Sequence, residues 1–107
     1  MSNTPPSLDL MFQALSDPTR RMIVERLSRG PASVRDLARP ITMSLPSVLQ
    51  HLQVLEASGL VASQKIGRVR MCSLRPIALQ MVEHWVNQHR IGTDRQVDGP
   101  KDPNGTA

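Results

Sequence analysis

The stretch Met43-Ser-Leu-Pro-Ser-Val-Leu-Gln-His-Leu-Gln-Val-Leu-Glu-Ala-Ser-Gly-Leu-Val61 decides the fold of this chain. Its apolar residues recur three or four positions apart, which is the spacing of one face of an α-helix: Leu45, Val48, Leu52 and Leu55. Ser44 can cap the free N–H groups at the start of such a helix, and Gly59 can supply the turn that ends it. We therefore predict a helix that begins after Ser44 and ends near Gly59.

A shorter helix and a hairpin are expected on either side of this segment. Ser33 is a capping residue, Asp36 follows three positions later in an imperfect capping box, and Pro40 ends a helix over 34–39. After the long helix, the segments 60–66 and 69–74 are candidate strands joined around Gly67. The order over 33–74 is thus helix, turn, helix and a small β-hairpin.

The long helix presents polar residues on the side away from its apolar stripe. An advance of about 100° per residue from Val48 gives this set: Pro46, Ser47, Gln50 and Gln53. The DNA major groove admits an α-helix, and Gln50 is the best candidate to contact a base because Gln pairs bidentately with adenine. Ser44 and the N–H groups after it suit a phosphate. His51 lies at the edge of the stripe, so its side chain can either pack against the core or contact a phosphate. A solvated amphipathic helix is the alternative for the whole face.

Three basic residues surround the expected hairpin turn: Lys65, Arg68 and Arg70. Taken alone, these residues are typical of a solvated hairpin. Directly after a helix-turn-helix they are expected to contact DNA phosphates, and such contacts position a protein without specifying the DNA sequence. The whole chain of 107 residues has 13 Lys and Arg against 9 Asp and Glu, a net charge of +4. This balance favours an anionic partner, and double-stranded DNA is the usual one.

The rest of the chain predicts further helices with apolar stripes. Helices are expected over 8–15, from Pro18 to about residue 28 with Met22, Ile23 and Leu27 facing inward, and from Pro76 onward. The stripes of the first and last helices are too large for one small core to cover, so we expect them to pack across a two-fold axis in a homodimer. The interface residues are then Leu8, Met11, Phe12, Leu15, Ile77, Met81 and Trp85.

These elements fit one domain that is mainly α with a small β-hairpin wing. We expect it to span 8–90, with a disordered N-terminus over 1–7 and a disordered polar tail over 91–107. No signal-peptide pattern or apolar run of about 20 residues is present, which favours a cytoplasmic protein without a membrane partner. The single Cys72 agrees with a reducing compartment.

Several motifs of the chain resemble the ArsR/SmtB family of bacterial repressors. They are Ala14-Leu-Ser-Asp-Pro-Thr-Arg-Arg21, Met43-Ser-Leu-Pro-Ser-Val48, His51-Leu52 and Val54-Leu-Glu-Ala-Ser-Gly-Leu-Val61. The resemblance implies a winged helix-turn-helix homodimer whose first and last helices form the interface. It also implies binding to a palindromic operator, usually to repress transcription.

The resemblance also bears on metal binding. Metal-sensing members place a Cys-X-Cys pair where this chain has Ser33 and Arg35, and the Arg35 cation opposes metal binding. His84 and His89, five positions apart in the last helix, point about 140° apart and cannot chelate together. We therefore expect no metal and no cofactor. A redox-responsive repressor acting through Cys72 is an alternative, although a lone Cys in a strand is more often a small buried residue.

No nucleophile–base pair, glycine-rich phosphate loop or paired carboxylates are present in the sequence, so an enzyme is not expected. The competing function is a winged-helix module that binds a protein in place of DNA. Salt dependence separates the two, because phosphate contacts weaken steeply as salt rises. The sequence thus favours a DNA-binding regulator.

Overall fold

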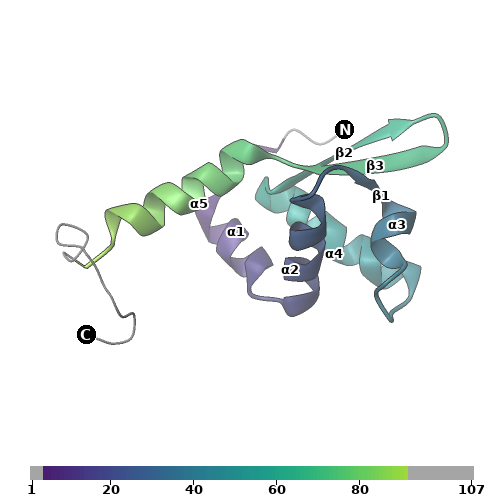
Figure 1. Ribbon diagram of the computed structural model, residues 1–107, viewed down its shortest axis with the longest axis horizontal. Helices are drawn as coiled ribbons and strands as arrows, with labels where there is room; N and C mark the ends of the chain where they lie inside the picture. Colours follow the sequence, from purple (N-terminus) through teal and green to yellow (C-terminus); the bar gives the residue numbers. More distant parts are fainter. Residues whose placement is uncertain (1–3, 92–107) are drawn as a thin grey trace.

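A computed structural model describes residues 4–91 of the chain, and Figure 1 shows its elements. In chain order they are α1 (Leu8–Leu15), α2 (Pro18–Leu27), β1 (Ala32–Ser33), α3 (Val34–Ala38), α4 (Leu45–Ser58), β2 (Val61–Ile66), β3 (Val69–Leu74) and α5 (Pro76–Gln88). The predicted fold class, mainly α with a small β wing, is confirmed. The predicted bounds agree with the observed ones to within one or two residues.

Local capping explains where these helices begin. Four helices start after a residue whose side chain accepts a hydrogen bond from the N–H three positions later: Ser7 from Leu10, Asp17 from Arg20, Ser33 from Asp36 and Ser44 from Ser47. These bonds satisfy N–H groups that have no partner inside the helix. At the other end of α4, Gly59 has a φ of 89°, a left-handed conformation that glycine adopts without steric cost.

The sheet has three antiparallel strands in the order β1-β3-β2. The β2–β3 pair is the predicted hairpin, closed by the Ile66↔Val69 pair around a turn in which Gly67 has a φ of 65°. We call this hairpin, residues 61–74, the wing. β1 was not predicted, because a two-residue strand has no alternation of its own. Its pairing of Ser33 with Met71 fixes the start of α3 against the wing.

The core lies between α1, α2, α4 and the base of the sheet. Its buried apolar residues are Met11, Ala14, Ile23, Leu27, Ala32, Leu37, Val48, Leu52, Leu55, Leu60, Val61, Cys72 and Ala78. Two expectations about it are wrong. Met22 is 48 % exposed and Leu45 is 50 % exposed, because each lies beyond the edge of the face that its helix turns to the core.

The N-terminal segment contacts the end of α4. The Ser7 N–H donates to the Ser58 carbonyl at 3.2 Å, and Arg75 Nη1 donates to the Thr4 carbonyl. A Cβ on Gly59 would come within 2.5 Å of the Pro6 Cα atom. The expected disorder over 1–7 is therefore wrong for residues 4–7, while the expectations for 1–3 and 92–107 lie outside the described residues.

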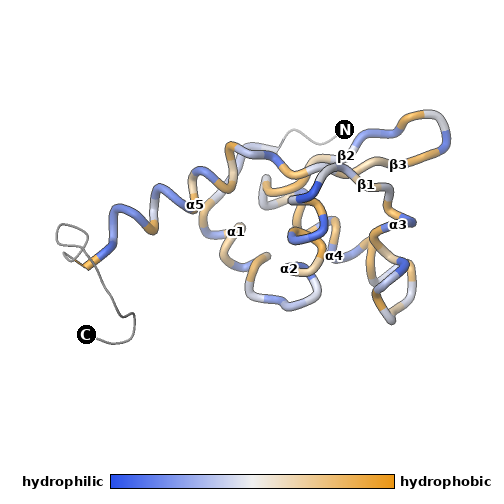
Figure 2. Tube along the Cα trace, in the orientation of Figure 1, coloured by the Kyte–Doolittle hydropathy of each residue, from blue (hydrophilic) through white to orange (hydrophobic). Residues whose placement is uncertain are grey.

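α5 leaves the body of the molecule beside α1 and extends away from it (Figure 1). Hydrophobic and hydrophilic residues alternate along it (Figure 2), yet Ala78 is its one fully buried residue. No helix within residues 4–91 is both long and apolar enough to cross a membrane.

Candidate nucleic-acid interface

The outer face of α4 carries the polar residues that the helical spacing selected. Ser44, Pro46, Gln50 and Gln53 are exposed and Ser47 is half-buried, whereas the opposite face is in the core. A helix that is anchored on one side and polar on the other can enter a major groove without uncovering its core. The structure therefore brings five of the six residues predicted on α4 and its cap to one outer surface.

The first turn of α4 is more saturated than we expected. The Ser47 N–H donates to Ser44 Oγ at 3.3 Å, and the Ser44 hydroxyl donates to Ser47 Oγ at 3.0 Å. Pro46 has no N–H, so the N–H groups of this turn without a partner inside the helix are those of Leu45 and the capping Ser44. An anion at this helix end would therefore find few backbone donors, together with the Ser47 hydroxyl, whose proton the Ser44–Ser47 hydrogen bond does not use.

His51 lies against α2 and not on the outer face of α4. Its side chain is 20 % exposed, and Nδ1 lies 3.2 Å from Arg20 Nη1 and 3.8 Å from Asp17 Oδ2. Arg20 also donates from Nε to the Ala14 carbonyl at 2.8 Å, so it links α1, α2 and α4. His51 is thus a packing residue, and we withdraw it from the DNA-facing set.

The cap at Asp17 is the charged part of this link. The Arg20 N–H donates to Asp17 Oδ2 at 3.0 Å, and this bond, with the nearby Arg20 guanidinium, lowers the pKa of the Asp17 carboxyl. The carboxylate therefore stays ionised beside the α2 N-terminus, where negative charge is stabilised by the helix dipole. Arg20 was not selected from the sequence, because its partners are fixed only by the tertiary fold.

The wing places its basic residues in different surroundings. Lys65 and Arg70 are directly opposite across β2 and β3, an arrangement that is unfavourable for like charges. Glu56 of α4 relieves it, since Arg70 Nη2 lies 3.0 Å from Glu56 Oε2 and Nε donates to Ser63 Oγ at 3.1 Å. Arg70 therefore braces the wing on α4. Lys65 and Arg68 are exposed and form no ion pair with any residue in 4–91.

The single cysteine is poorly placed to react. Cys72 is fully buried in β3, and burial, with a smaller contribution from Glu56, raises the pKa of its thiol to about 11. A reactive thiol needs exposure and a lowered pKa. The redox-responsive alternative is therefore not favoured.

Known proteins share both this sequence and this architecture. Residues 15–64 match a family described as a helix-turn-helix domain. The HTH-type transcriptional regulator Rv2034 of Mycobacterium tuberculosis is 48% identical over 73 residues, 68% of this chain and 68% of that protein. The transcriptional repressor SdpR of Bacillus subtilis is 33% identical over 76 residues, 71% of this chain and 84% of that protein. The crystal structure of an ArsR family transcriptional regulator has a TM-score of 0.73 at 48% identity, covering 76% of this chain and 89% of that one.

The chain belongs to the ArsR/SmtB family. It is a winged helix-turn-helix transcriptional regulator that binds DNA, and the expectation that it is not an enzyme is confirmed. The alternative of a protein-interaction module is not favoured. The resemblance inferred from the sequence motifs is confirmed as well.

The positions that this ArsR/SmtB member has in place of a thiol pair serve other purposes. Ser33 caps α3, and Arg35 is exposed on the first turn of that helix. His89 stacks on Trp85 with a centroid distance of 4.3 Å, and its Nδ1–H donates to the Trp85 carbonyl at 2.8 Å. Within residues 4–91, no group of three or more His, Cys, Asp or Glu side chains is arranged to hold a metal ion.

Proposed function

We propose that this regulator binds a palindromic operator as a homodimer and represses transcription in the cytoplasm. The observation that carries the proposal is the division of α4 into a buried face and an exposed polar face, with the wing fixed beside it. In a two-fold dimer, two such helices enter successive major grooves about 34 Å apart. The operator then repeats its half-site in inverted orientation.

The dimer is supported by the uncovered apolar surface of α1 and α5. Phe12, Ile77 and Trp85 are between 40% and 51% exposed, and the Phe12 and Trp85 rings meet edge to face at a centroid distance of 5.5 Å. Leu8, Leu15 and Met81 beside them are partly buried. Exposed apolar area of this kind is typical of a protein interface. Met11 has no exposed surface, so we remove it from the predicted interface residues.

Within this arrangement, the α4 and wing residues have separate roles. Gln50 and Gln53 contact base edges, while Ser44, Ser47 and the Pro46 ring line the helix end that approaches the backbone. Lys65 and Arg68 contact phosphates. Arg70 acts through its contact with Glu56, and holds the wing in place.

We propose further that this member does not sense metal through α3 or α5. The support is chemical, because soft thiolate ligands are replaced by a hydroxyl and a guanidinium at Ser33 and Arg35. Addition of Zn²⁺ or Cd²⁺ to the protein–operator complex should leave its dissociation constant unchanged. Release of the DNA at micromolar metal would contradict this part of the proposal.

The test begins with selection of the operator from a random duplex library. We expect the enriched sequences to contain an inverted repeat. Arg68→Ala should weaken binding to all duplexes and lower the slope of log K against log salt by about one unit. Gln50→Ala should relax the preference at one base position and leave the slope unchanged. Enrichment without an inverted repeat, or identical behaviour of the two variants, would refute the proposed arrangement.

A further inference from the structure

The surface of α3 carries a basic feature that the sequence motifs did not identify. Arg35 and Arg39 are four residues apart, so they lie on one side of the helix, and both are exposed. The opposite side of α3 is anchored by Leu37, which is 2% exposed. The two guanidinium groups therefore face solvent from a fixed support.

The charges of the reading head, residues 32–74, show which of its cations are free. Its two acidic residues each pair with an arginine: Asp36 with Arg39 at 3.1 Å, and Glu56 with Arg70 at 3.0 Å. Arg35, like Lys65 and Arg68, forms no ion pair with any residue in 4–91. An exposed cation without an acidic partner is free to bind an external anion.

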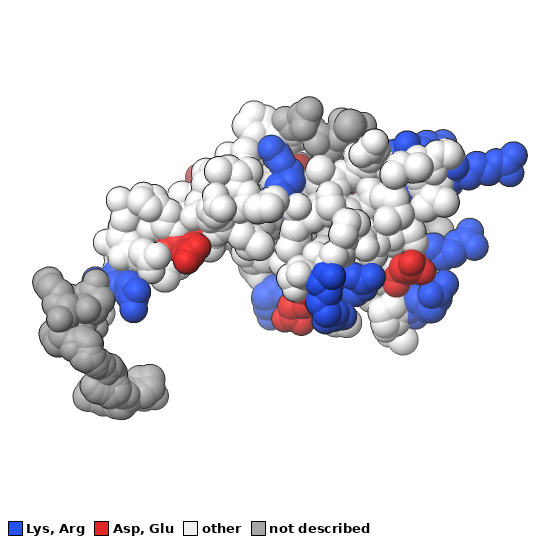
Figure 3. Space-filling view, turned by 45° about the horizontal axis from the view of Figure 1, so that its top comes forward, with Lys and Arg blue, Asp and Glu red and all other residues white. Residues whose placement is uncertain are grey.

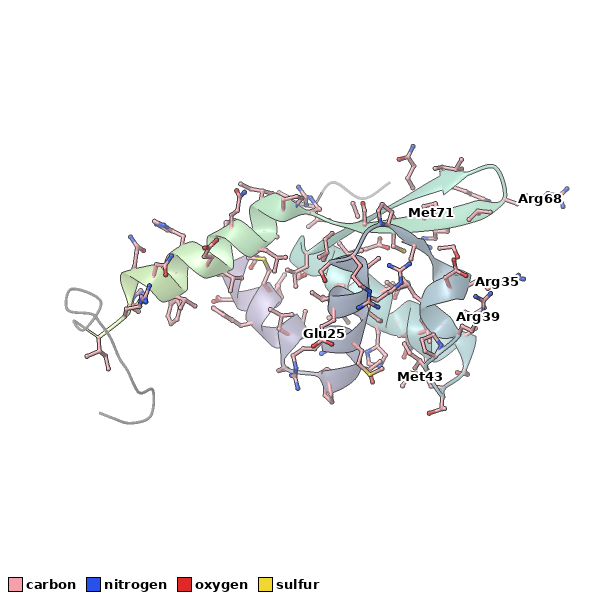
Figure 4. All side chains as sticks on the ribbon, viewed as in Figure 1. Glu25, Arg35, Arg39, Met43, Arg68 and Met71 are labelled. Carbon is pink, nitrogen blue, oxygen red and sulfur yellow. The ribbon has the colours of Figure 1, made fainter. Side chains whose placement is uncertain are left out.

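These cations lie on one side of the molecule. Figure 4 shows that Arg35, Arg39 and Arg68 point outward on the same side, with Met43, just before α4, at the lower end of that side. In Figure 3, several Lys and Arg side chains gather over the end formed by the wing and α3. α3 therefore lies between the tip of the wing and the start of the helix that reads the groove.

The fold holds α3 and the wing in a defined relation. β1 pairs with β3, with Ser33 opposite Met71, and α3 follows β1 without a connecting residue. α3 is therefore held beside the wing and ahead of α4, so a DNA segment that runs from the start of α4 to the wing is within reach of α3. A duplex carries a phosphate charge every 1.7 Å of its axis, so phosphates are available along the whole path.

We propose that Arg35, assisted by Arg39, binds DNA phosphates between the contacts made by α4 and those made by the wing. This inference rests on the proposed function and adds a third contact region to it. Arg35 contributes more than Arg39, because Asp36 already neutralises Arg39 and must release it. The contact is to the backbone, so it strengthens binding to every sequence alike.

The experiment measures binding of two fluorescein-labelled duplexes over a range of salt concentrations: the selected operator and a 40-base-pair duplex of mixed sequence. Arg35→Ala should weaken binding to both duplexes by the same factor, about three- to tenfold, and lower the salt slope by about one unit. Arg35→Lys keeps the charge and should retain most of the affinity. Arg39→Ala should have a smaller effect of the same kind.

Arg90→Ala is the matched control, since it removes the same charge from an exposed residue two positions after the end of α5. It should bind both duplexes as the unmodified protein does. Circular dichroism of Arg35→Ala checks its fold, which a substitution at an exposed position should preserve.

Two outcomes separate this inference from the proposed function. If Arg68→Ala weakens binding while Arg35→Ala equals the unmodified protein, the α3 contact is wrong and the proposed function stands. If the unmodified protein binds neither duplex in a salt-dependent way, both are wrong. A loss on the operator alone in Arg35→Ala would also overturn the inference, because it would indicate a base contact.

Discussion

At the scale of single residues, burial decides what Cys72 can do. The thiol lies in β3 opposite Ser63 of β2, where burial raises its pKa to about 11. At pH 8 a thiol with that pKa is ionised to about 0.1 %, against about 10 % for one at the ordinary value of 9.0. Oxidants and alkylating agents react with the thiolate, so ionisation alone slows the reaction about a hundredfold.

We predict that the folded protein resists thiol reagents. At pH 8, Ellman's reagent should label Cys72 at less than a hundredth of the rate seen after unfolding in guanidinium chloride. The absorbance of the released thiolate measures both rates on the same sample. Rapid labelling of the folded protein, or loss of operator binding on mild peroxide treatment, would restore the redox-responsive alternative.

The same scale shows why His51 could not be assigned from the sequence. Its helical angle places it at the edge of the apolar stripe, where either a core or a surface position is compatible with the pattern. The deciding partner is Arg20, which is 31 residues earlier in the chain. Contacts at such separations follow from the packing of α2 on α4, which periodicity does not describe.

At the scale of elements, the wing is attached to the reading helix through one charged pair. The Glu56 side chain is 13% exposed and that of Arg70 is 46% exposed, so the pair is partly shielded from solvent. Without Glu56, Arg70 would remain beside Lys65 with no acid to separate the two charges. The pair therefore stabilises the orientation of the wing as well as the fold.

We expect Glu56→Gln to lower the free energy of unfolding by about 0.5–1 kcal/mol at low salt, a modest value because one partner is half-exposed. Urea denaturation measures this change. Asp36→Asn is the control, since it breaks the ion pair between Asp36 and Arg39. In that pair the Arg39 side chain is 71% exposed and the Asp36 side chain is 49% exposed. That change should be near zero. Equal effects of the two variants would mean that the Glu56–Arg70 pair does not fix the wing.

Helices and strands whose ends are marked by nearby residues could be predicted from the sequence. An element that exists only because it pairs with a distant strand could not. Ser44 and Gly59 mark the ends of α4 through bonds within a few residues, so its bounds followed from the sequence. β1 exists because β3 pairs with it, and two residues carry no pattern of their own. The periodicity of α2 predicted a stripe but not its width, which is why Met22 was placed inside.

At the scale of the whole molecule, one chain leaves its last helix half covered. α5 lies beside α1 near its start and then extends beyond the body (Figure 1). Trp85 and Val86 are 41% and 48% exposed on its outer half. A second copy of the chain can cover this surface by a two-fold arrangement that also positions two α4 helices for an inverted repeat.

We therefore predict that the protein is a dimer of 11.9 kDa chains. Trp85→Ala should raise the dissociation constant of this dimer at least thirtyfold, because truncation of a buried interface Trp typically costs about 2 kcal/mol or more of binding free energy. Sedimentation equilibrium measures the constant. Val86→Lys places a charge on the same surface without removing a ring, and should raise the dissociation constant as well. Ile66→Ala is the control, since Ile66 is 58% exposed on the wing and should leave the dimer intact. A stable dimer from both Trp85→Ala and Val86→Lys would show that α5 does not form the subunit interface.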